Sequence, residues 1–139
     1  MGDLRKNFSK SEFKCKCGCG VYKEMDPSLL DGLQLLSDNT KRKITINSGY
    51  RCKKHPIEAK KKTPGEHEKA RAADIVIEGL TPKQMLIEVL KIPQFASGGI
   101  GIYVPNKNII HVDTRGQKAR WSYINGVERS FVDGLKLLK

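Results

Sequence analysis

Gly98-Gly-Ile-Gly-Ile-Tyr103 and the following Ile109-Ile-His-Val-Asp113 are the part of the sequence that decides the fold. Both runs are largely apolar, and Pro105-Asn-Lys-Asn108 separates them with residues that favour turns. Two such runs predict a β-hairpin with a connection of four or five residues. Because side chains alternate between the two faces of a strand, His111 and Asp113 share one face of this hairpin.

Hydrophobic periodicity and helix-start signals predict the other elements. Asp26-Pro27 begins a helix that runs to about residue 38, and Thr81-Pro82 begins another that stops before Pro93. Strands are expected at residues 43–48, 73–77 and 119–124, a long loop with a helical turn at 49–71, and either a helix or a strand at 131–138. Because βαβ alternation is not regular, this mixture predicts an α+β fold with a mainly antiparallel sheet and flanking helices.

The length of the chain predicts a single domain over residues 1–139, with the cysteine-containing residues 1–25 packed on it. Hydrophobic residues make up 38%, and no apolar run approaches the roughly 20 residues that cross a bilayer, so no membrane insertion is expected. The N-terminus lacks the apolar region of a secretory signal. We therefore expect a monomer that is made in the cytoplasm.

Basic residues outnumber acidic ones by 26 to 15, which gives a formal net charge of +11 and favours a polyanionic partner. Residues 51–71 carry eight cations and three acids, a local charge of +5. This stretch is either a solvated lysine-rich loop or a surface that attracts an anionic substrate. Aromatic residues make up only 6% and do not alternate with basic ones, so nucleic-acid binding is not expected.

His67, Asp74 and His111 are the candidate metal ligands. The chain has three histidines, and two of them are in this set. Imidazole nitrogen and carboxylate oxygen are good zinc ligands, and three protein ligands plus one water form the open arrangement of a catalytic zinc site. These residues predict a zinc hydrolase. The other interpretation is a buried histidine and a salt-bridged aspartate without a metal.

Several motifs occur in an order that resembles one family of peptidases. They are Ser48-Gly-Tyr-Arg51, His67 to Asp74, Gly99-Ile-Gly-Ile-Tyr103, His111-Val-Asp-Thr-Arg115 and Ala119-Arg-Trp121, preceded by Asn7-Phe-Ser-Lys-Ser-Glu-Phe13 with its cysteines. From residue 7 to about residue 123 the chain resembles the zinc D-alanyl-D-alanine carboxypeptidases, peptidoglycan peptidases with a hedgehog-type zinc peptidase fold. That family includes phage L-alanyl-D-glutamate endolysins.

The resemblance implies that His67, Asp74 and His111 bind one zinc ion, with water at the fourth position. It also implies a four-stranded antiparallel sheet flanked by helices, with the zinc site on the open face of the sheet. In such a site zinc lowers the pKa of water towards ~7 and polarises the scissile carbonyl, while a carboxylate carries the proton to the leaving amine.

Three positions depart from the family pattern. Gly65 and Ala70 stand where relatives usually have serine and glycine. Asn108 stands where some relatives have an acidic general base, and an amide is a poor proton acceptor. The departures affect the loop before Asp74 and the identity of the base, but they remove no metal ligand.

Asp113 is the expected catalytic base, because it shares a strand face with His111. An alternative role for Asp113 is to orient His67 or Arg51 from behind the metal site. Glu66 is a second candidate for the base.

Arg51 is the second expected catalytic residue. The resemblance implies that its planar guanidinium binds a substrate carboxylate or steadies the oxyanion, and a structural salt bridge is the alternative. Ser48 and Tyr50 are expected to bind substrate together with Arg51. Trp121 is expected to form a wall of the site.

The four cysteines leave three possibilities open. Cys15, Cys17 and Cys19 alternate along the chain, and Cys52 follows Arg51. Converging thiols can hold a structural zinc ion. A disulfide from the cluster to Cys52 would suit an oxidising compartment, and free thiols are the third possibility.

The expected function is zinc-dependent hydrolysis of a peptide bond in the stem or cross-link of bacterial peptidoglycan. Carboxypeptidase and endopeptidase specificities are both open. The alternative is a catalytically silent module of the same fold that binds peptidoglycan or builds a virion. We expect a bacterial or phage protein that acts on the cell wall, such as a lysis protein or a virion component.

Overall fold

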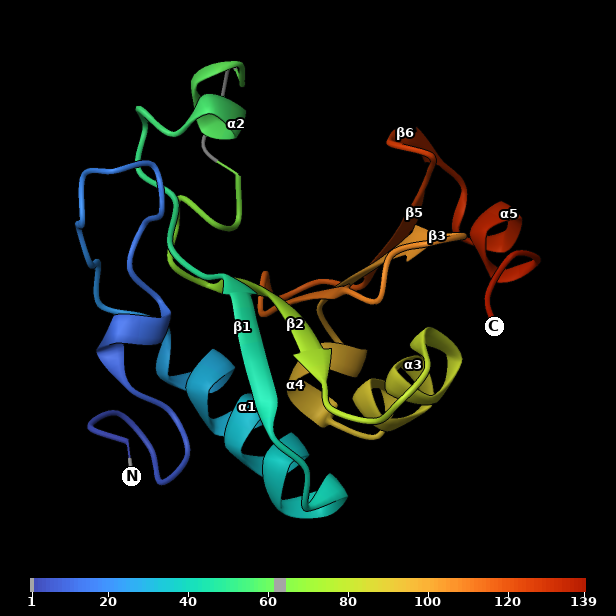
Figure 1. Cartoon of the computed structure of the whole chain (residues 1–139), viewed down its shortest axis with the longest axis horizontal. Helices are drawn as coiled ribbons and strands as arrows, with labels where there is room; N and C mark the ends of the chain where they lie inside the picture. The colour runs from blue at the N-terminus through green and yellow to red at the C-terminus, as the bar shows by residue number, and fades with distance from the viewer. Residues whose placement is uncertain (1, 62–64) are drawn as a thin grey trace.

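The computed structural model describes residues 2–61 and 65–139 of the chain. Its strands form one six-stranded sheet in the order β1-β2-β4-β3-β5-β6. Figure 1 shows the sheet and the helices around it. The strands are β1 (Ile44–Ser48), β2 (Ala72–Ile77), β3 (Gly99–Val104), β4 (Ile110–Asp113), β5 (Ala119–Ile124) and β6 (Val127–Arg129). The helices are α1 (Pro27–Thr40), α2 (Pro56–Ala59), α3 (Pro82–Leu90), α4 (Pro93–Ala96) and α5 (Phe131–Leu135), with a short 3-10 helix, η1 (Lys10–Glu12).

The sheet confirms the predicted α+β fold. Strands β1, β2, β4 and β3 pair antiparallel, and β3 and β4 form the predicted hairpin. Beyond these four strands, β5 pairs parallel to β3, and β6 pairs antiparallel to β5. The four-stranded sheet implied by the resemblance is therefore extended by two strands. The sequence does not reveal β6 or α4, because three and four residues are too short for a periodic pattern.

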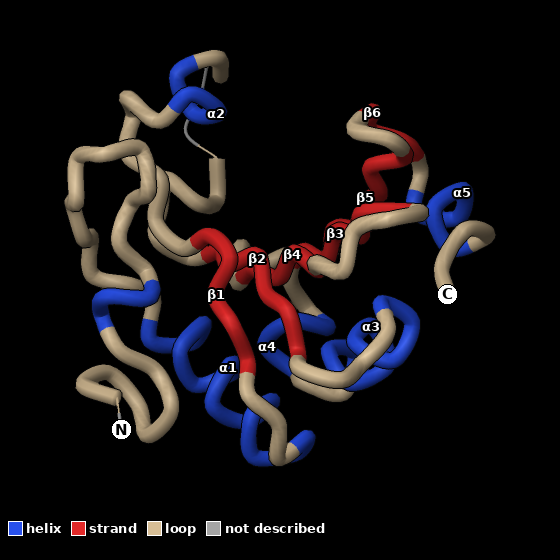
Figure 2. The backbone as a smooth tube through the Cα atoms, in the orientation of Figure 1, coloured by secondary structure: helices blue, strands red, loops and turns tan. Residues whose placement is uncertain are grey.

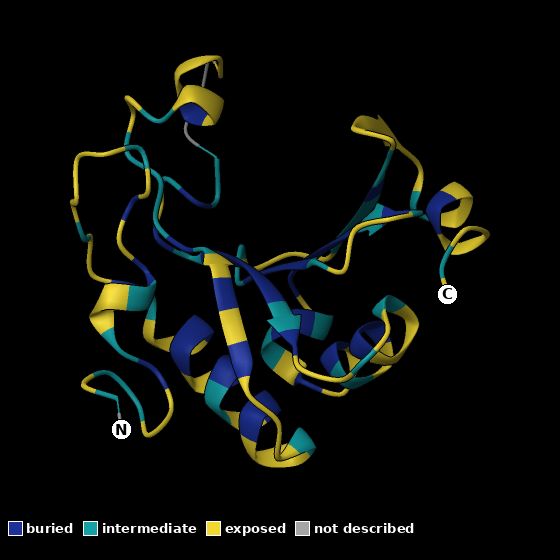
Figure 3. Cartoon of the chain, viewed as in Figure 1, coloured by how far each residue is buried: buried dark blue, intermediate teal, exposed yellow. Residues whose placement is uncertain are grey.

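Helices α1, α3 and α4 lie along one face of the sheet and leave the other face open (Figure 2). Buried positions are found both in the strands and in the helices on this face (Figure 3). Strand β3 shows the alternation: Ile100, Ile102 and Val104 are buried in the core, so Gly99, Gly101 and Tyr103 point to the open face. Helix α5 packs against β5 and β3 at one end of the sheet and resolves the ambiguity at residues 131–138.

The N-terminal segment contributes to the same core. Phe8, Phe13 and Met25 are almost fully buried in the main hydrophobic cluster. The backbone N–H of Tyr50 donates to the carbonyl of Phe13 at 2.9 Å, which joins this segment to the chain after β1. The predicted start of α1 is confirmed, because the Asp26 side chain accepts a hydrogen bond from the N–H of Ser28.

The loop over residues 49–71 contains the predicted helical turn as α2. Residues 62–64 of this loop, including Lys62 of the basic stretch, lie outside the described residues. In the described parts of the chain, no helix combines the length and the apolar character needed to span a bilayer.

Candidate metal centre

One row of residues crosses the open face of the sheet and contains two of the candidate ligands. The strand register pairs Asp74 with His111, His111 with Gly101, and Gly101 with Trp121. Side chains that are paired in register on neighbouring strands point to the same face. The sheet therefore brings Asp74 and His111 together although 37 positions separate them in the sequence.

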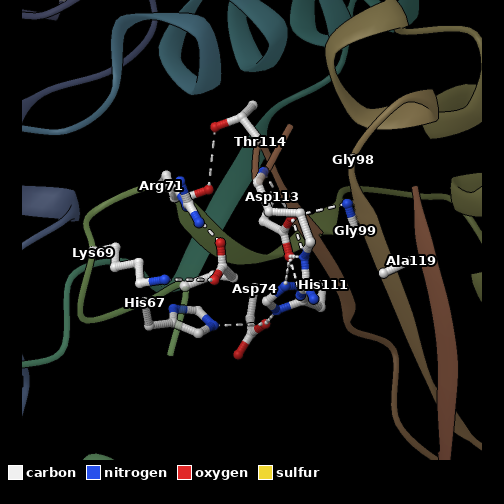
Figure 4. Close-up of polar contacts among 12 residues, drawn as sticks. His67, Lys69, Arg71, Asp74, Gly98, Gly99, His111, Asp113, Thr114 and Ala119 are labelled. Carbon is white, nitrogen blue, oxygen red and sulfur yellow. Dashed lines mark hydrogen bonds and ion pairs between the residues drawn. The ribbon is translucent and has the colours of Figure 1, made fainter. Parts of the chain in front are cut away.

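His67 completes the group from the loop that precedes β2 (Figure 4). Asp74 Oδ1 lies 3.0 Å from His111 Nδ1 and 3.4 Å from His67 Nε2. A tetrahedral ion with nitrogen and oxygen ligands at about 2.0–2.1 Å separates its ligand atoms by about 3.3 Å. All three side chains are buried. The spacing therefore fits one metal ion among these three atoms.

The second nitrogen of each imidazole has its own partner. His67 Nδ1 lies 2.8 Å from the carbonyl oxygen of Gly49, to which it donates. His111 Nε2 lies 2.8 Å from Asp113 Oδ2 and donates to that carboxylate. Partners of this kind fix the orientation and the tautomer of a metal-binding imidazole. They leave His67 Nε2 and His111 Nδ1 to face Asp74.

The bonding state of His67 Nε2 tests whether a metal fits. This atom is buried and has no hydrogen-bond partner among the residues that the structure describes. A buried polar atom without a partner costs about 1–3 kcal/mol, so native structures rarely contain one. A metal ion between His67, Asp74 and His111 would supply the partner, and two imidazoles with one carboxylate suit zinc. His67, Asp74 and His111 therefore fit a zinc ion.

Asp113 is enclosed behind His111. Its carboxylate accepts from Arg115 Nη2 at 2.7 Å and from Arg115 Nε at 3.0 Å. It also accepts from the N–H of Gly99 at 2.8 Å, and the residue is 0% exposed. The carboxylate orients His111, whereas the alternative role expected from the sequence was to orient His67 or Arg51. Its contacts favour such a positioning role over proton transfer.

The charges of the site follow from burial and from hydrogen bonds. Burial opposes ionisation of Asp74, but the hydrogen bond from His111, together with the close approach of the His67 imidazole, outweighs it and holds the pKa of the carboxyl well below its ordinary value. Burial lowers the pKa of His67, so its imidazole is neutral at pH 7. Burial also disfavours charge on His111, but hydrogen bonds to Asp113 and Asp74 raise its pKa. His111 therefore carries the proton that a metal ion must displace.

Gly99 and Gly101 keep the open face clear for the site. A Cβ at Gly99 would collide with the carboxylate of Asp113, and a Cβ at Gly101 would lie 2.6 Å from Trp121 Nε1. Figure 4 shows Gly99 beside Asp113. The Trp121 ring lies 4.9 Å from the His111 ring between centroids. The Gly-Ile-Gly pattern of β3 is therefore needed for Asp113 and Trp121 to reach His111.

The three candidate ligands open into a cavity of about 700 Å³. Three aromatic side chains line the cavity: Tyr103 and Tyr123 stack with ring centroids 5.3 Å apart, and Trp121 also belongs to the lining. Burial, followed by the nearby charge of Asp74, raises the pKa of Tyr103, so its phenol keeps its proton. A cavity of this size accommodates a peptide-sized ligand.

The structure brings Arg51 into the site but places Ser48 and Tyr50 differently from the prediction. Arg51 Nη2 lies 3.0 Å from Asp74 Oδ2 and lines the cavity. Ser48 Oγ accepts from Arg51 Nε at 3.1 Å, so Ser48 positions Arg51. Tyr50 packs against the hydrophobic core. Neither Ser48 nor Tyr50 is among the described residues that line the cavity.

The structure shows the surroundings of two residues that depart from the family pattern, Ala70 and Asn108. Ala70 has a φ of +59°, a left-handed conformation that favours glycine, which is the residue that the resemblance implies at this position. Asn108 is exposed in the hairpin connection and is not among the described residues of the cavity wall.

Sequence reasoning missed Tyr103 and Tyr123 as components of the site. Tyr103 follows Gly101 by two positions and therefore shares its face of β3. The alternation of side chains along this strand could have revealed Tyr103 from the sequence. Tyr123 is paired with Tyr103 in the parallel register of β5 and β3. That parallel pairing could not be read from the sequence.

A comparison with protein families supports the assignment that the site points to. The sequence model described as Peptidase M15 matches residues 6–113, which include His67, Asp74 and His111. Searches of curated proteins and of solved structures gave no match. Because the family match covers more than half of the chain, the protein belongs to the Peptidase M15 family of metallopeptidases.

Proposed function

We propose that the protein is a zinc-dependent peptidase that hydrolyses a peptide bond in the stem or cross-link of bacterial peptidoglycan. The observation that carries the proposal is the convergence of His67 Nε2, Asp74 Oδ1 and His111 Nδ1 at the cavity. Membership of the Peptidase M15 family supports hydrolysis of a peptide bond. When bound, zinc supplies a water of lowered pKa and polarises the scissile carbonyl.

Charge along the cavity supports an anionic peptide as the substrate. Arg51, Lys61, Lys107 and Arg115 line the cavity. Stem peptides of peptidoglycan carry free carboxylates, which these cations attract. The described part of the basic stretch at residues 51–71 thus contributes two cations, Arg51 and Lys61, to the substrate side of the site.

The proton acceptor in this proposal is Glu66. Glu66 and Glu128 are the described carboxylates of the cavity lining besides Asp74. The carboxylate of Glu66 is paired with Arg71 and Lys69, but its side chain stays 13% exposed beside His67, whereas Glu128 lies on β6 at the exposed edge of the sheet. Asp113 has no exposed surface from which to reach a substrate. The phenol of Tyr103 keeps its proton and can donate a hydrogen bond to the developing oxyanion.

Conservative amide substitutions separate the roles of Asp113 and Glu66. Asp113→Asn should weaken zinc binding by about 10–100-fold, because an oriented carboxylate behind a metal-binding imidazole has that effect. Glu66→Gln should keep zinc and lower kcat by about 10²–10⁴-fold. Zinc affinity is measured by chelator competition and kcat with a wall peptide, with Glu128→Gln as the matched control. Normal zinc affinity with a slow kcat in Asp113→Asn would restore Asp113 as the base.

Zinc binding should release one proton, from His111. Between the lowered pKa of His67 and the raised pKa of His111, metal-free His111 is protonated and His67 is neutral. Zinc affinity should therefore rise about tenfold per pH unit in this window and level off above the pKa of His111. Calorimetric titration in buffers of different ionisation enthalpy counts the protons. Release of no proton, or of two, between the two pKa values would contradict this assignment.

Digestion of purified peptidoglycan tests the proposed function. The protein is incubated with cell-wall material as purified, after metal removal with a chelator, and after zinc is added back. We expect fragments that mass spectrometry assigns to one cleaved peptide bond, their loss with chelator and their return with zinc. Wall binding without any released fragment, by zinc-loaded protein on several wall chemistries, would instead support the silent binding module.

A further inference from the structure

The four cysteines form a second cluster on the described chain, separate from the candidate metal centre. Cys15 Sγ lies 3.4 Å from Cys17 Sγ and 3.6 Å from Cys52 Sγ. Cys52 Sγ also lies 3.4 Å from Cys17 Sγ and 3.6 Å from Cys19 Sγ. All four sulfur atoms are within 4.8 Å of one another. The cluster uses every cysteine in the chain.

These separations are those of one tetrahedral ion surrounded by four sulfurs. Zinc–sulfur bonds of about 2.3 Å place the sulfurs of a tetrahedral site about 3.8 Å apart. All four thiols are free in the structure. We propose that Cys15, Cys17, Cys19 and Cys52 bind a second zinc ion as a closed, four-thiolate structural site.

The backbone around the cluster is shaped to present the sulfurs. Gly18 and Gly20 have φ of +104° and +66°, and both allow the tight turn that brings three alternating cysteines to one point. The N–H of Cys15 donates to the carbonyl of Val21 at 2.8 Å and closes this turn. Backbone N–H groups also point at sulfur: that of Cys52 lies 3.3 Å from Cys15 Sγ, and that of Val21 lies 3.4 Å from Cys19 Sγ. Such contacts stabilise thiolates.

The second site would hold the loop that carries part of the catalytic machinery. Cys52 directly follows Arg51, which pairs with Asp74. The N–H of Arg51 donates to the carbonyl of His67 at 3.3 Å, and the carbonyl of Gly49 accepts from His67 Nδ1. A zinc ion bound to Cys52 would tie the turn at residues 15–21 to the loop that contains Gly49 and Arg51. Because Gly49 and Arg51 contact the ligands of the first zinc site, the second zinc ion would hold these contacts in place. Its role is structural, because four protein ligands leave no position for water.

Metal content of paired variants tests the proposal. The wild-type protein should hold two zinc ions, one per cluster, by elemental analysis. His111→Ala should keep one, and Cys17→Ser combined with Cys19→Ser should keep the other. With cobalt in place of zinc, a sulfur-to-metal charge-transfer absorption should persist in His111→Ala and vanish in the cysteine variant. Lys14→Ser, at an exposed neighbour of Cys15, is the matched control and should keep both ions.

A measurement on the unmodified protein guards against a cysteine variant that fails to fold. The four thiols of the native, zinc-loaded protein should react slowly with a thiol reagent and quickly once a chelator is added. Intact mass should show no loss of hydrogen. A mass lowered by two hydrogens per bridge would overturn the zinc site in favour of disulfides. Fast reaction of all four thiols without chelator would overturn it in favour of free cysteines. Neither result depends on peptidase activity, so each leaves the proposed function untouched.

Discussion

His111→Ala should abolish peptidase activity and empty the catalytic zinc site. The substitution removes one of three ligand atoms and takes from Asp74 and Asp113 the imidazole that each contacts, which leaves Asp74 with Arg51 and Asp113 with Arg115 and Gly99. Loss of the metal removes several kcal/mol of transition-state stabilisation, which corresponds to a fall in kcat/KM of about 10³-fold or more. Asp74→Ala should have the same effect, because its Oδ1 lies between both imidazoles.

His55→Ala is the matched control for this experiment. His55 is the third histidine, and its Nδ1 accepts from the N–H of Ile57 at the start of α2. It should keep both zinc content and activity near the wild-type values. Zinc is quantified after dialysis, and activity is followed by release of wall fragments. Activity in His111→Ala within tenfold of the wild type would contradict the ligand assignment.

Arg51→Ala should destabilise the fold by about 1–3 kcal/mol, because the buried carboxylates of Glu58 and Asp74 each lose a charged hydrogen-bond partner. The side chain of Glu58 is 0% exposed, and Arg51 Nη1 lies 3.4 Å from its Oε2. In the variant, Glu58 would keep Lys61 as its partner. The Lys61 side chain is 40% exposed, so solvent weakens this remaining ion pair. Urea unfolding of the zinc-loaded protein measures the loss. An unchanged unfolding midpoint would contradict the structural part of this account.

A double variant separates the structural role of Arg51 from a role in substrate binding. Arg51→Met with Glu58→Leu replaces both charges by apolar side chains of similar volume, so most of the lost stability should return. If Arg51 binds a carboxylate of the substrate, KM for a wall peptide should stay raised in this double variant. Recovery of KM together with stability would leave Arg51 with the structural role alone. Arg51→Lys keeps the charge but loses the forked geometry, so it should fall between the wild type and Arg51→Ala.

Local sequence patterns were sufficient to predict the elements that position the site. The hairpin, the β2 strand and the helices α1 and α3 follow from alternation, from apolar periodicity and from Asp26 and Thr81 as N-caps. The shared face of His111 and Asp113 follows from the two-residue period of a strand, and the contact between their side chains agrees with it.

Pairings between distant segments could not be predicted in the same way. The parallel alignment of β5 with β3, which stacks Tyr123 on Tyr103, depends on long-range packing that no local pattern encodes. The contacts of Asp113 could not be predicted from a local pattern either. Its hydrogen bonds with Arg115 and Gly99 enclose it, and they depend on where the hairpin meets the following loop. The exposure of a carboxylate is a property of the folded molecule and cannot be read from the sequence. The sequence therefore favoured Asp113 as the base, whereas its burial in the structure favours a positioning role.

Anomalous scattering from crystals of the zinc-loaded protein at the zinc absorption edge tests the central claim most directly. The account predicts a peak on the open face of the sheet, about 2.0–2.2 Å from His67 Nε2, Asp74 Oδ1 and His111 Nδ1, with His111 Nε2 still bonded to Asp113. A peak at these three atoms would establish the catalytic metal centre. Density that shows zinc elsewhere, with no peak among His67, Asp74 and His111, would contradict it.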